Sequence, residues 1–309
     1  MTHPVRAVVF AYHDVGVRCL KTLLSGGVEV PLVVTVQDDP GEVSWFASVA
    51  DCAHDYGLNV VAPADPNTPE FAARLASLDV DFLFSFYYRA MLGDDLLQCA
   101  RRGALNMHGS LLPKYRGRAP VNWAILNGER ECGATLHYMV ARADAGDIVD
   151  QQSVPILADD DAREVYVKVT AAAEMVLARS LSGLLEGNAP RRAQPLVPGQ
   201  YFGRRRPEDG RIDWRWPARR IHDLVRAVAP PFPGAFAEVG GERWWLHRTR
   251  VAAHTLTPGA PRLIGAAGEC QLVCADGSVL RILQAVNAAG AIDLTQMAYD
   301  FERRPVPLV

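Results

Sequence analysis

The sequence predicts an α/β protein in which a Rossmann-like, mostly parallel sheet with helices on both faces precedes a small β-rich, barrel-like (OB-like) C-terminal domain. Two observations predict this order. Short apolar runs alternate with helical patterns over the first half of the 309-residue chain, and short strand-like runs separated by Gly and Pro fill the last third. This length favours two domains. We expect a catalytic domain over residues 1–189, a linker over 190–203 and a β-rich domain over 204–309.

The first strand is expected at Arg6–Ala11, because an unbroken apolar run is typical of a strand buried on both faces. Helical spacing then predicts a helix over Asp14–Leu24, which the following glycine pair ends. The same alternation continues along the chain. It predicts strands at Val28–Val36, Asn59–Ala62, Asp81–Phe86 and Ala104–Met107, and helices at Trp45–Tyr56 (with Ser44 as N-cap), Glu70–Leu78 and Leu96–Arg101.

The pattern changes after residue 130. Ala134–Val140 and Ile148–Val154 are expected to be neighbouring strands, and Ala162–Glu186 a long amphipathic helix. Pro190–Gln200 contains Pro, Gly and paired Arg, which is typical of a linker. Short strands follow at Ala235–Val239, Arg243–Arg250, Leu272–Cys274 and Val279–Ala285.

Composition excludes several classes of protein. Hydrophobic residues make up 49% of the chain, yet no stretch approaches the roughly 18 apolar residues of a membrane-spanning helix. The N-terminus has no signal-peptide pattern and the six scattered cysteines form no disulfide framework, so we expect a soluble cytoplasmic protein. The net charge is −3, and residues 201–309 carry 15 basic and 11 acidic groups. We therefore expect no nucleic-acid partner and no membrane insertion.

Two segments that could form a dinucleotide site and a zinc site lack the residues that these sites need. The first β–α turn, Phe10–Gly16, has no G-x-G-x-x-G pattern, so it encodes no cradle for a dinucleotide. Cys270 and Cys274 would share one face of a strand, but neither a second pair nor a nearby His completes a zinc site. We expect no metal.

A polar segment begins where the strand predicted at Ala104–Met107 runs out. Asn106 and His108 are two apart, so both side chains point to one side of the strand, at the sheet edge where ligands bind. An amide donor beside an imidazole suits acyl transfer, because one group stabilises an oxyanion and the other exchanges a proton. A lone Asn-x-His is also a common structural cap. The Gly-, Pro- and Arg-rich loop that follows and the acidic turn Arg142–Ile148, which offers a carboxylate to the histidine, favour chemistry.

The run Asn106–Pro120 (NMHGSLLPKYRGRAP) and the Asp144-Ala145-Gly146 turn resemble the folate-dependent formyltransferase family. The resemblance covers the chain to about residue 250. It is closest to the UDP-4-amino-4-deoxy-L-arabinose formyltransferases of lipid A modification and polymyxin resistance, through Val9–Asp14, Phe84–Arg89, Phe202–Arg205, Val225–Val228 and Pro233–Phe236. We expect the transferase domain alone, without the decarboxylating dehydrogenase domain to which that branch is often fused.

The resemblance implies transfer of a formyl group from the co-substrate 10-formyltetrahydrofolate to the 4-amino group of a nucleotide-linked sugar. His108 would act as general base and later acid, Asn106 as oxyanion donor, and Asp144 would orient His108. The implied folate contacts are Ala90, Met91, Leu92, Arg118, Val140, Ala141, Arg142 and Ala143. The implied sugar contacts are Tyr87, Tyr88, Arg89, Arg204 and Arg205.

Two alternatives stay open. A methionyl-tRNA formyltransferase would share the same three catalytic residues, although the modest positive charge of residues 201–309 is weak for a tRNA binder. A catalytically silent nucleotide-sugar binding protein would have no need of all three. The sequence leaves open the sugar and its nucleotide, the enzyme that supplies the substrate, the oligomeric state, the roles of the last 60 residues and whether Leu112–Pro113 is cis.

Overall fold

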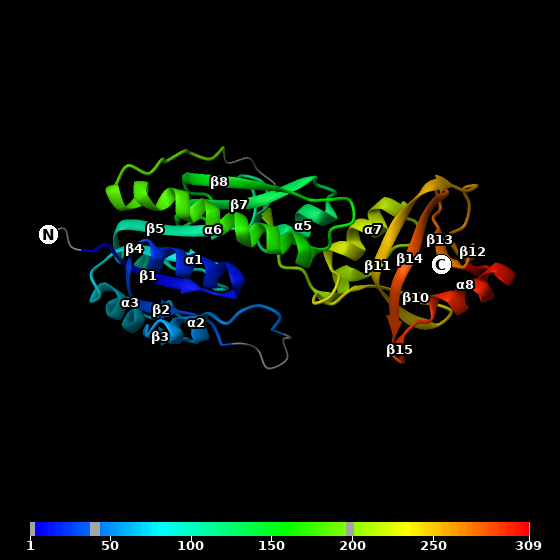
Figure 1. The fold of residues 1–309 in the computed structure, drawn as a ribbon, viewed down its shortest axis with the longest axis horizontal. Helices are drawn as coiled ribbons and strands as arrows, with labels where there is room; N and C mark the ends of the chain where they lie inside the picture. Colours follow the sequence, from blue (N-terminus) through cyan, green and yellow to red (C-terminus); the bar gives the residue numbers. More distant parts are fainter. Residues whose placement is uncertain (1–3, 38–43, 196–200, 309) are drawn as a thin grey trace. The chain divides into compact units, whose positions relative to one another are not determined.

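The structure is a computed structural model that describes residues 4–37, 44–195 and 201–308 (Figure 1). Contacts divide the chain into two compact units. The first unit comprises residues 1–120, 131–154 and 167–203, and the second comprises 121–130, 155–166 and 204–309. Residues 196–200 of the predicted linker lie outside the described residues.

The first unit is built on a seven-stranded sheet with the order β3-β2-β1-β4-β5-β7-β8. Its strands are β1 (Arg6–Ala11), β2 (Glu29–Val34), β3 (Val60–Val61), β4 (Val80–Phe86), β5 (Ala100–His108), β7 (Glu131–Tyr138) and β8 (Ile148–Pro155). The pairs from β3 to β5 are parallel, and β5 pairs with β7 antiparallel. The predicted mostly parallel sheet is therefore confirmed, and β7 and β8 are neighbours as expected.

Six helices accompany this part of the chain: α1 (His13–Ser25), α2 (Val49–Asp55), α3 (Pro69–Ala76), α4 (Asp94–Leu97), α5 (Pro120–Leu126) and α6 (Ala162–Glu186). Leu75 of α3 and Leu96 of α4 pack with Phe10 in one core against the sheet. In Figure 1, α1 and α6 lie together in front of the strands, and an ion pair between Arg18 and Glu174 links them.

Two predicted helices have different bounds. The helix predicted at Trp45–Tyr56 begins only at Val49, because Ser48 rather than Ser44 caps it by accepting a hydrogen bond from the Asp51 N–H. The helix predicted at Leu96–Arg101 is wrong after Leu97. Ala100 and Arg101 begin β5, since pairing with β4 and the contacts of Arg101 with Asp79 and Asp81 favour the extended chain.

The second unit contains an antiparallel sheet with the order β10-β11-β14-β13-β12-β16. Its elements are η1 (Pro207–Gly210), α7 (Ala218–Ala227), β10 (Ala235–Val239), β11 (Glu242–Thr255), β12 (Arg262–Ala266), β13 (Glu269–Val273), β14 (Ser278–Asn287), β15 (Gly290–Ala291), α8 (Leu294–Arg303) and β16 (Val306–Pro307). The β-rich character is confirmed. The sequence did not predict α7 and α8, which pack on the sheet.

The sequence pattern did not indicate helix α7, because the buried face of this helix is partly polar. His222 donates to or accepts from Thr249 Oγ1 at 3.0 Å, and its other ring nitrogen lies 2.9 Å from the Ala158 carbonyl oxygen. Asp223 and Arg226 form a buried ion pair at 2.8 Å. An apolar stripe of helical period is therefore interrupted in the sequence although the helix is well buried.

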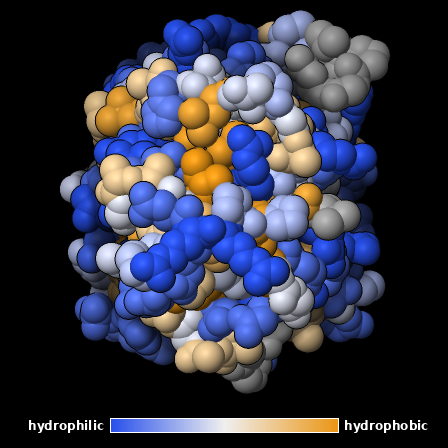
Figure 2. All heavy atoms as spheres, turned by 90° about the vertical axis from the view of Figure 1, so that its right-hand side faces the viewer, coloured by the Kyte–Doolittle hydropathy of each residue, from blue (hydrophilic) through white to orange (hydrophobic). Residues whose placement is uncertain are grey.

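Figure 2 shows the face of the molecule seen from the right-hand side of Figure 1. Hydrophilic residues cover most of this face, and the hydrophobic ones gather in a short band in its upper half. Among the described residues, no helix combines the length and the apolar character that crossing a bilayer requires.

Candidate active site

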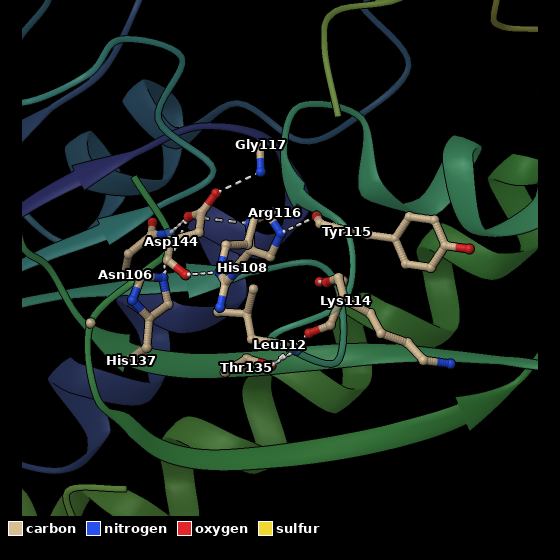
Figure 3. Close-up of polar contacts among 12 residues, drawn as sticks. Asn106, His108, Leu112, Lys114, Tyr115, Arg116, Gly117, Thr135, His137 and Asp144 are labelled. Carbon is tan, nitrogen blue, oxygen red and sulfur yellow. Dashed lines mark hydrogen bonds and ion pairs between the residues drawn. The ribbon is translucent and has the colours of Figure 1, made fainter. Parts of the chain in front are cut away.

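The structure brings Asn106, His108 and Asp144 together at the end of β5 (Figure 3). Nδ1 of His108 lies 3.5 Å from Oδ1 of Asp144, and Nδ2 of Asn106 donates to the same oxygen at 3.3 Å. His108 is only 6% exposed. An amide and an imidazole two residues apart and a carboxylate from a later turn therefore share one small polar site.

Asp144 lies in the turn between β7 and β8 with a left-handed backbone, at a φ of 52°. Its Oδ2 accepts a 2.8 Å hydrogen bond from the Gly117 N–H, which joins this turn to the loop after His108. Burial acts to raise the pKa of Asp144, but the charge of His108 and the contact with His137 outweigh it. The pKa of Asp144 consequently lies well below its usual range, and the carboxylate stays ionised.

Both ring nitrogens of His108 face an oxygen. Nε2 donates to the carbonyl oxygen of Tyr115 at 2.9 Å, while Nδ1 faces the Asp144 carboxylate. A carbonyl oxygen can only accept, so Nε2 carries a hydrogen in this arrangement.

His137, on β7, is a member of the site that the sequence did not single out. It lies directly opposite Asn106 in the antiparallel register and is only 1% exposed. Its Nδ1 donates to the Tyr138 carbonyl at 2.8 Å, which leaves Nε2 to accept from Asn106 Nδ2 at 3.1 Å. Strand register is the only signal that could have found His137, and a single sequence does not give it.

Nδ2 of Asn106 therefore directs its two hydrogens toward His137 and Asp144. Donation to a third acceptor, as an oxyanion donor must provide, requires one of these two bonds to open. The amide is thus held in place by the site rather than presented free.

Hydrogen bonds shape the loop that follows His108. Thr135 Oγ1 donates to the Ser110 carbonyl at 2.6 Å, and Ser110 Oγ donates to the Lys114 carbonyl at 2.7 Å. The Leu112–Pro113 peptide bond is cis. The Ser110 side chain thus closes the turn that follows His108.

Seven of the eight predicted folate contacts lie in two segments of the first unit, residues 90–92 and 140–143. Met91 is 55% and Val140 46% exposed, unusual for large apolar side chains, whereas Leu92 is buried in the core. Val140 and the glycine at 146 line a cavity of about 320 Å³, over whose Tyr138 wall the Arg191 guanidinium stacks at 3.7 Å. This cavity has a lining of both apolar and polar residues, and its volume lies in the range of small-molecule sites.

The other predicted folate contacts do not line this cavity. The Arg118 side chain is exposed, and its backbone N–H donates to the Phe202 carbonyl at 2.9 Å. Ala141 and Arg142 are exposed in the turn that leads to Asp144. The last two, Ala90 and Ala143, are half-buried.

The predicted sugar contacts are dispersed. In the first unit, Arg89 is exposed and stacks on Tyr12 at 4.4 Å, whereas Tyr88 turns toward the core and meets Phe10 at 5.1 Å. Tyr87 has a φ of 59°, and its hydroxyl packs where a side chain on residue 109 would stand.

Arg204 and Arg205 belong to the second unit. Arg205 stacks over the Trp123 ring at 4.9 Å and donates to the Asp209 carbonyl at 2.9 Å, contacts that anchor its own segment. Arg204 is exposed. Within the ranges that the structure describes, no cluster of three or more His, Cys, Asp or Glu side chains could hold a metal ion.

Comparison with known proteins identifies a family. The formyl transferase family matches residues 6–181, and the formyl transferase C-terminal domain matches residues 205–297. The fold is similar to that of an N-formyltransferase from Helicobacter canadensis in complex with folinic acid and dTDP-3-aminofucose. That chain is 20% identical, with 90% of this chain and 98% of that chain covered, and the TM-score is 0.72.

Two further solved structures share the fold. WlaRD, a sugar 3N-formyl transferase in the presence of dTDP and 5-N-formyl-THF, is 19% identical, with 94% of this chain and 99% of that chain covered and a TM-score of 0.70. A sugar N-formyltransferase from Shewanella sp FDAARGOS_354 is 20% identical, with 82% of this chain and 100% of that chain covered and a TM-score of 0.63.

Proposed function

Because the chain belongs to the formyl transferase family, we propose that it moves a formyl group from 10-formyltetrahydrofolate to the 4-amino group of a nucleotide-linked amino sugar. The acceptor that the sequence runs favour is UDP-4-amino-4-deoxy-L-arabinose, the sugar of lipid A modification. The observation that carries this proposal is the convergence of Asn106, His108 and Asp144 at one edge of the sheet.

Each of the three residues has a distinct task in the proposed reaction. His108 accepts the proton that the sugar amine loses as its nitrogen bonds to the formyl carbon, and returns it to N10 as the C–N10 bond breaks. Such proton transfer contributes about 10²- to 10⁴-fold. Asn106 donates to the formyl oxygen while it carries negative charge, worth roughly 10²- to 10³-fold. The products are a sugar formamide and tetrahydrofolate, so the step needs no oxidant and no metal.

Asp144 acts through His108. Its ionised carboxylate faces Nδ1 of the imidazole, which fixes the ring and stabilises it once it has gained a proton. The Tyr115 carbonyl already receives the Nε2 hydrogen in this structure. For His108 to accept a proton, the neutral ring would carry its hydrogen on Nδ1, which faces Asp144, and the attacking amine would take the place of the Tyr115 carbonyl at a bare Nε2.

The residues that the resemblance assigns to folate belong to the same unit as these three. Met91 and Val140 are large apolar side chains left exposed at positions that the family resemblance assigns to folate, and Val140 lines the 320 Å³ cavity. Covering them with the pterin would remove apolar surface from water, at about 25 cal/mol per Å². This supports a folate carrier as the formyl source.

The most informative experiment offers four acceptors side by side and ranks kcat/KM. They are UDP-4-amino-4-deoxy-L-arabinose, a dTDP-4-amino-4,6-dideoxyhexose, dTDP-3-aminofucose and methionyl-tRNA. The third is included because the Helicobacter canadensis enzyme was crystallised with it. Preference for the arabinose derivative supports the proposal. Preference for a dTDP sugar overturns the arabinose derivative as acceptor but keeps a nucleotide-linked amino sugar. Preference for tRNA overturns the sugar assignment altogether.

A further inference from the structure

The backbone carbonyl of Asp144 is gripped by two buried side chains from elsewhere in the chain. Nε of Arg116 donates to this oxygen at 3.1 Å, and so does Nε2 of Gln194, also at 3.1 Å. The two side chains bind each other as well, since Arg116 Nη2 donates to Gln194 Oε1 at 3.1 Å. The result is a closed ring of three hydrogen bonds on the turn that carries the carboxylate.

Both side chains are deeply buried. Arg116 is 1% exposed, and Gln194 is also buried. Buried polar groups are costly unless their hydrogen bonds are made, so each group depends on the other and on the Asp144 carbonyl. Gln194 Nε2 donates in addition to the Gly146 carbonyl at 2.6 Å. One amide group thus holds the turn at two points.

The turn needs such support. Asp144 adopts a φ of 52°, a conformation that costs an L residue roughly 1 kcal/mol or more and persists only where its surroundings impose it. Released from the two donors, the turn would relax toward an unstrained backbone and carry the carboxylate away from His108.

Gln194 lies in the segment that the sequence marks as a linker, yet that segment is fastened to the first unit. Arg192 and Ile148 exchange two backbone hydrogen bonds, at 2.8 and 2.9 Å, next to the acidic turn. Further along, β9 (Tyr201–Phe202) pairs in parallel with β6 (Arg116–Gly117). Two stretches of the predicted linker therefore border the two loops that meet at Asp144.

We propose that Gln194 and Arg116 are positioning residues for formyl transfer, which hold the Asp144 turn so that its carboxylate stays aligned with His108. This inference rests on the proposed function for its kinetic test. Misplacement by about 1 Å can cost 10²-fold in rate. The two residues touch no reacting atom and act only through Asp144.

Gln194→Glu is the most selective variant. Its second carboxylate oxygen replaces the amide nitrogen, so it still accepts from Arg116 but no longer donates to the carbonyls of Asp144 and Gly146. Gln152→Glu is the matched control, because Gln152 lies on β8 in the same unit and binds Arg179 and the Ser153 carbonyl instead. We expect kcat to fall about 10- to 100-fold in Gln194→Glu, with both KM values within about threefold. The control should keep the wild-type kcat.

A double-mutant cycle separates positioning from general structural damage. If Gln194 acts through Asp144, then Gln194→Glu has little further effect on kcat in an Asp144→Asn background. Equal fold-losses in the two backgrounds, or a wild-type kcat in Gln194→Glu, would overturn the proposal. Arg116→Lys, which retains charge but loses the forked donor, should show the same dependence on Asp144.

Hydrogen exchange tests the clamp without any turnover. The Gly117 amide is protected by Asp144 Oδ2, so it reports whether the turn is in place. We expect this amide to exchange faster in Gln194→Glu than in Gln152→Glu. Unchanged exchange at Gly117 overturns the clamp even if all four acceptors fail, whereas faster exchange with no transfer to any acceptor upholds the clamp and refutes the proposed function.

Discussion

The backbone N–H of Gly117 donates a 2.8 Å hydrogen bond to Oδ2 of Asp144, so the loop after His108 and the acidic turn between β7 and β8 are directly joined. The other carboxylate oxygen faces His108. The two segments that supply His108 and Asp144 are thereby held in fixed relation. A change at residue 117 should disturb chemistry as well as stability.

The substitution Gly117→Ala should lower both the stability of the protein and its rate of turnover. Residue 117 has a φ of 101°, and a Cβ there would stand 2.3 Å from the Phe202 carbonyl oxygen. We expect a loss of about 1–3 kcal/mol in the free energy of unfolding, measured by urea titration, together with a clear drop in kcat. Gly27→Ala is the control, because Gly27 has a φ of 77° but nothing within 4 Å of the added carbon. Equal losses in both variants would mean that backbone strain alone is responsible.

His108→Ala should abolish turnover while leaving co-substrate binding intact. We expect kcat to fall about 10²- to 10⁴-fold, because the proton acceptor is lost, and the dissociation constant for a folate analogue, measured by calorimetry, to change less than threefold. His54→Ala, at an exposed histidine of α2, is the control. Substantial residual turnover in His108→Ala would show that His108 is not the proton acceptor of the reaction.

Asp144→Asn should slow transfer and shift its pH profile, because the amide no longer stabilises protonated His108. It should also change acid stability. The pKa of Asp144 is lowered in the folded state, so its contribution is present above the unfolded value near 4 and is lost as the pH falls through the folded value. The stability advantage of the wild-type protein over Asp144→Asn, from unfolding titrations at pH 7 and pH 3, should shrink at the lower pH. A constant difference would contradict this.

His137→Phe should act on Asn106. The substitution keeps an aromatic ring at His137, which is only 1% exposed, but removes the nitrogen that accepts from Asn106 Nδ2. Leaving one hydrogen of this half-buried amide unpaired costs about 1–3 kcal/mol, and a misaligned amide lowers kcat. Thermal unfolding and kinetics of the purified variant test both effects. If Asn106 is held by Asp144 alone, kcat will not change.

His222 should make the protein less stable in mild acid. Burial lowers the pKa of this histidine, and its hydrogen bond to the Ala158 carbonyl offsets burial only in part. The unfolded chain therefore binds the proton first, below about pH 6.5, and stability falls as the pH drops toward the folded value. Between pH 7.5 and 5.5, the Tm of the wild-type protein should fall more than that of His222→Gln. Parallel curves for the two proteins would show that His222 does not titrate in this range.

The buried strands of the first unit could be predicted from the apolar runs in the sequence. Arg6–Ala11 and Asp81–Phe86 are strands within one residue of their predicted bounds, because a strand covered on both faces carries a mostly apolar run. Helix α6 matches its predicted bounds because its apolar residues recur with helical spacing. The sequence did not predict helix α7, because its buried polar residues are paired only in the tertiary structure. Arg101 was assigned to a helix, but it lies in β5, which pairs with β4.

The chemical types of the site were determined by the sequence alone: an amide and an imidazole two residues apart at a strand end, and a carboxylate in a later turn. The tertiary structure alone decided that His137 joins them, because cross-strand register depends on how β5 and β7 pair. It also decided that Arg116 and Gln194 hold the Asp144 turn. Local patterns encode what a residue can do, whereas partners far along the chain meet only when the whole fold closes.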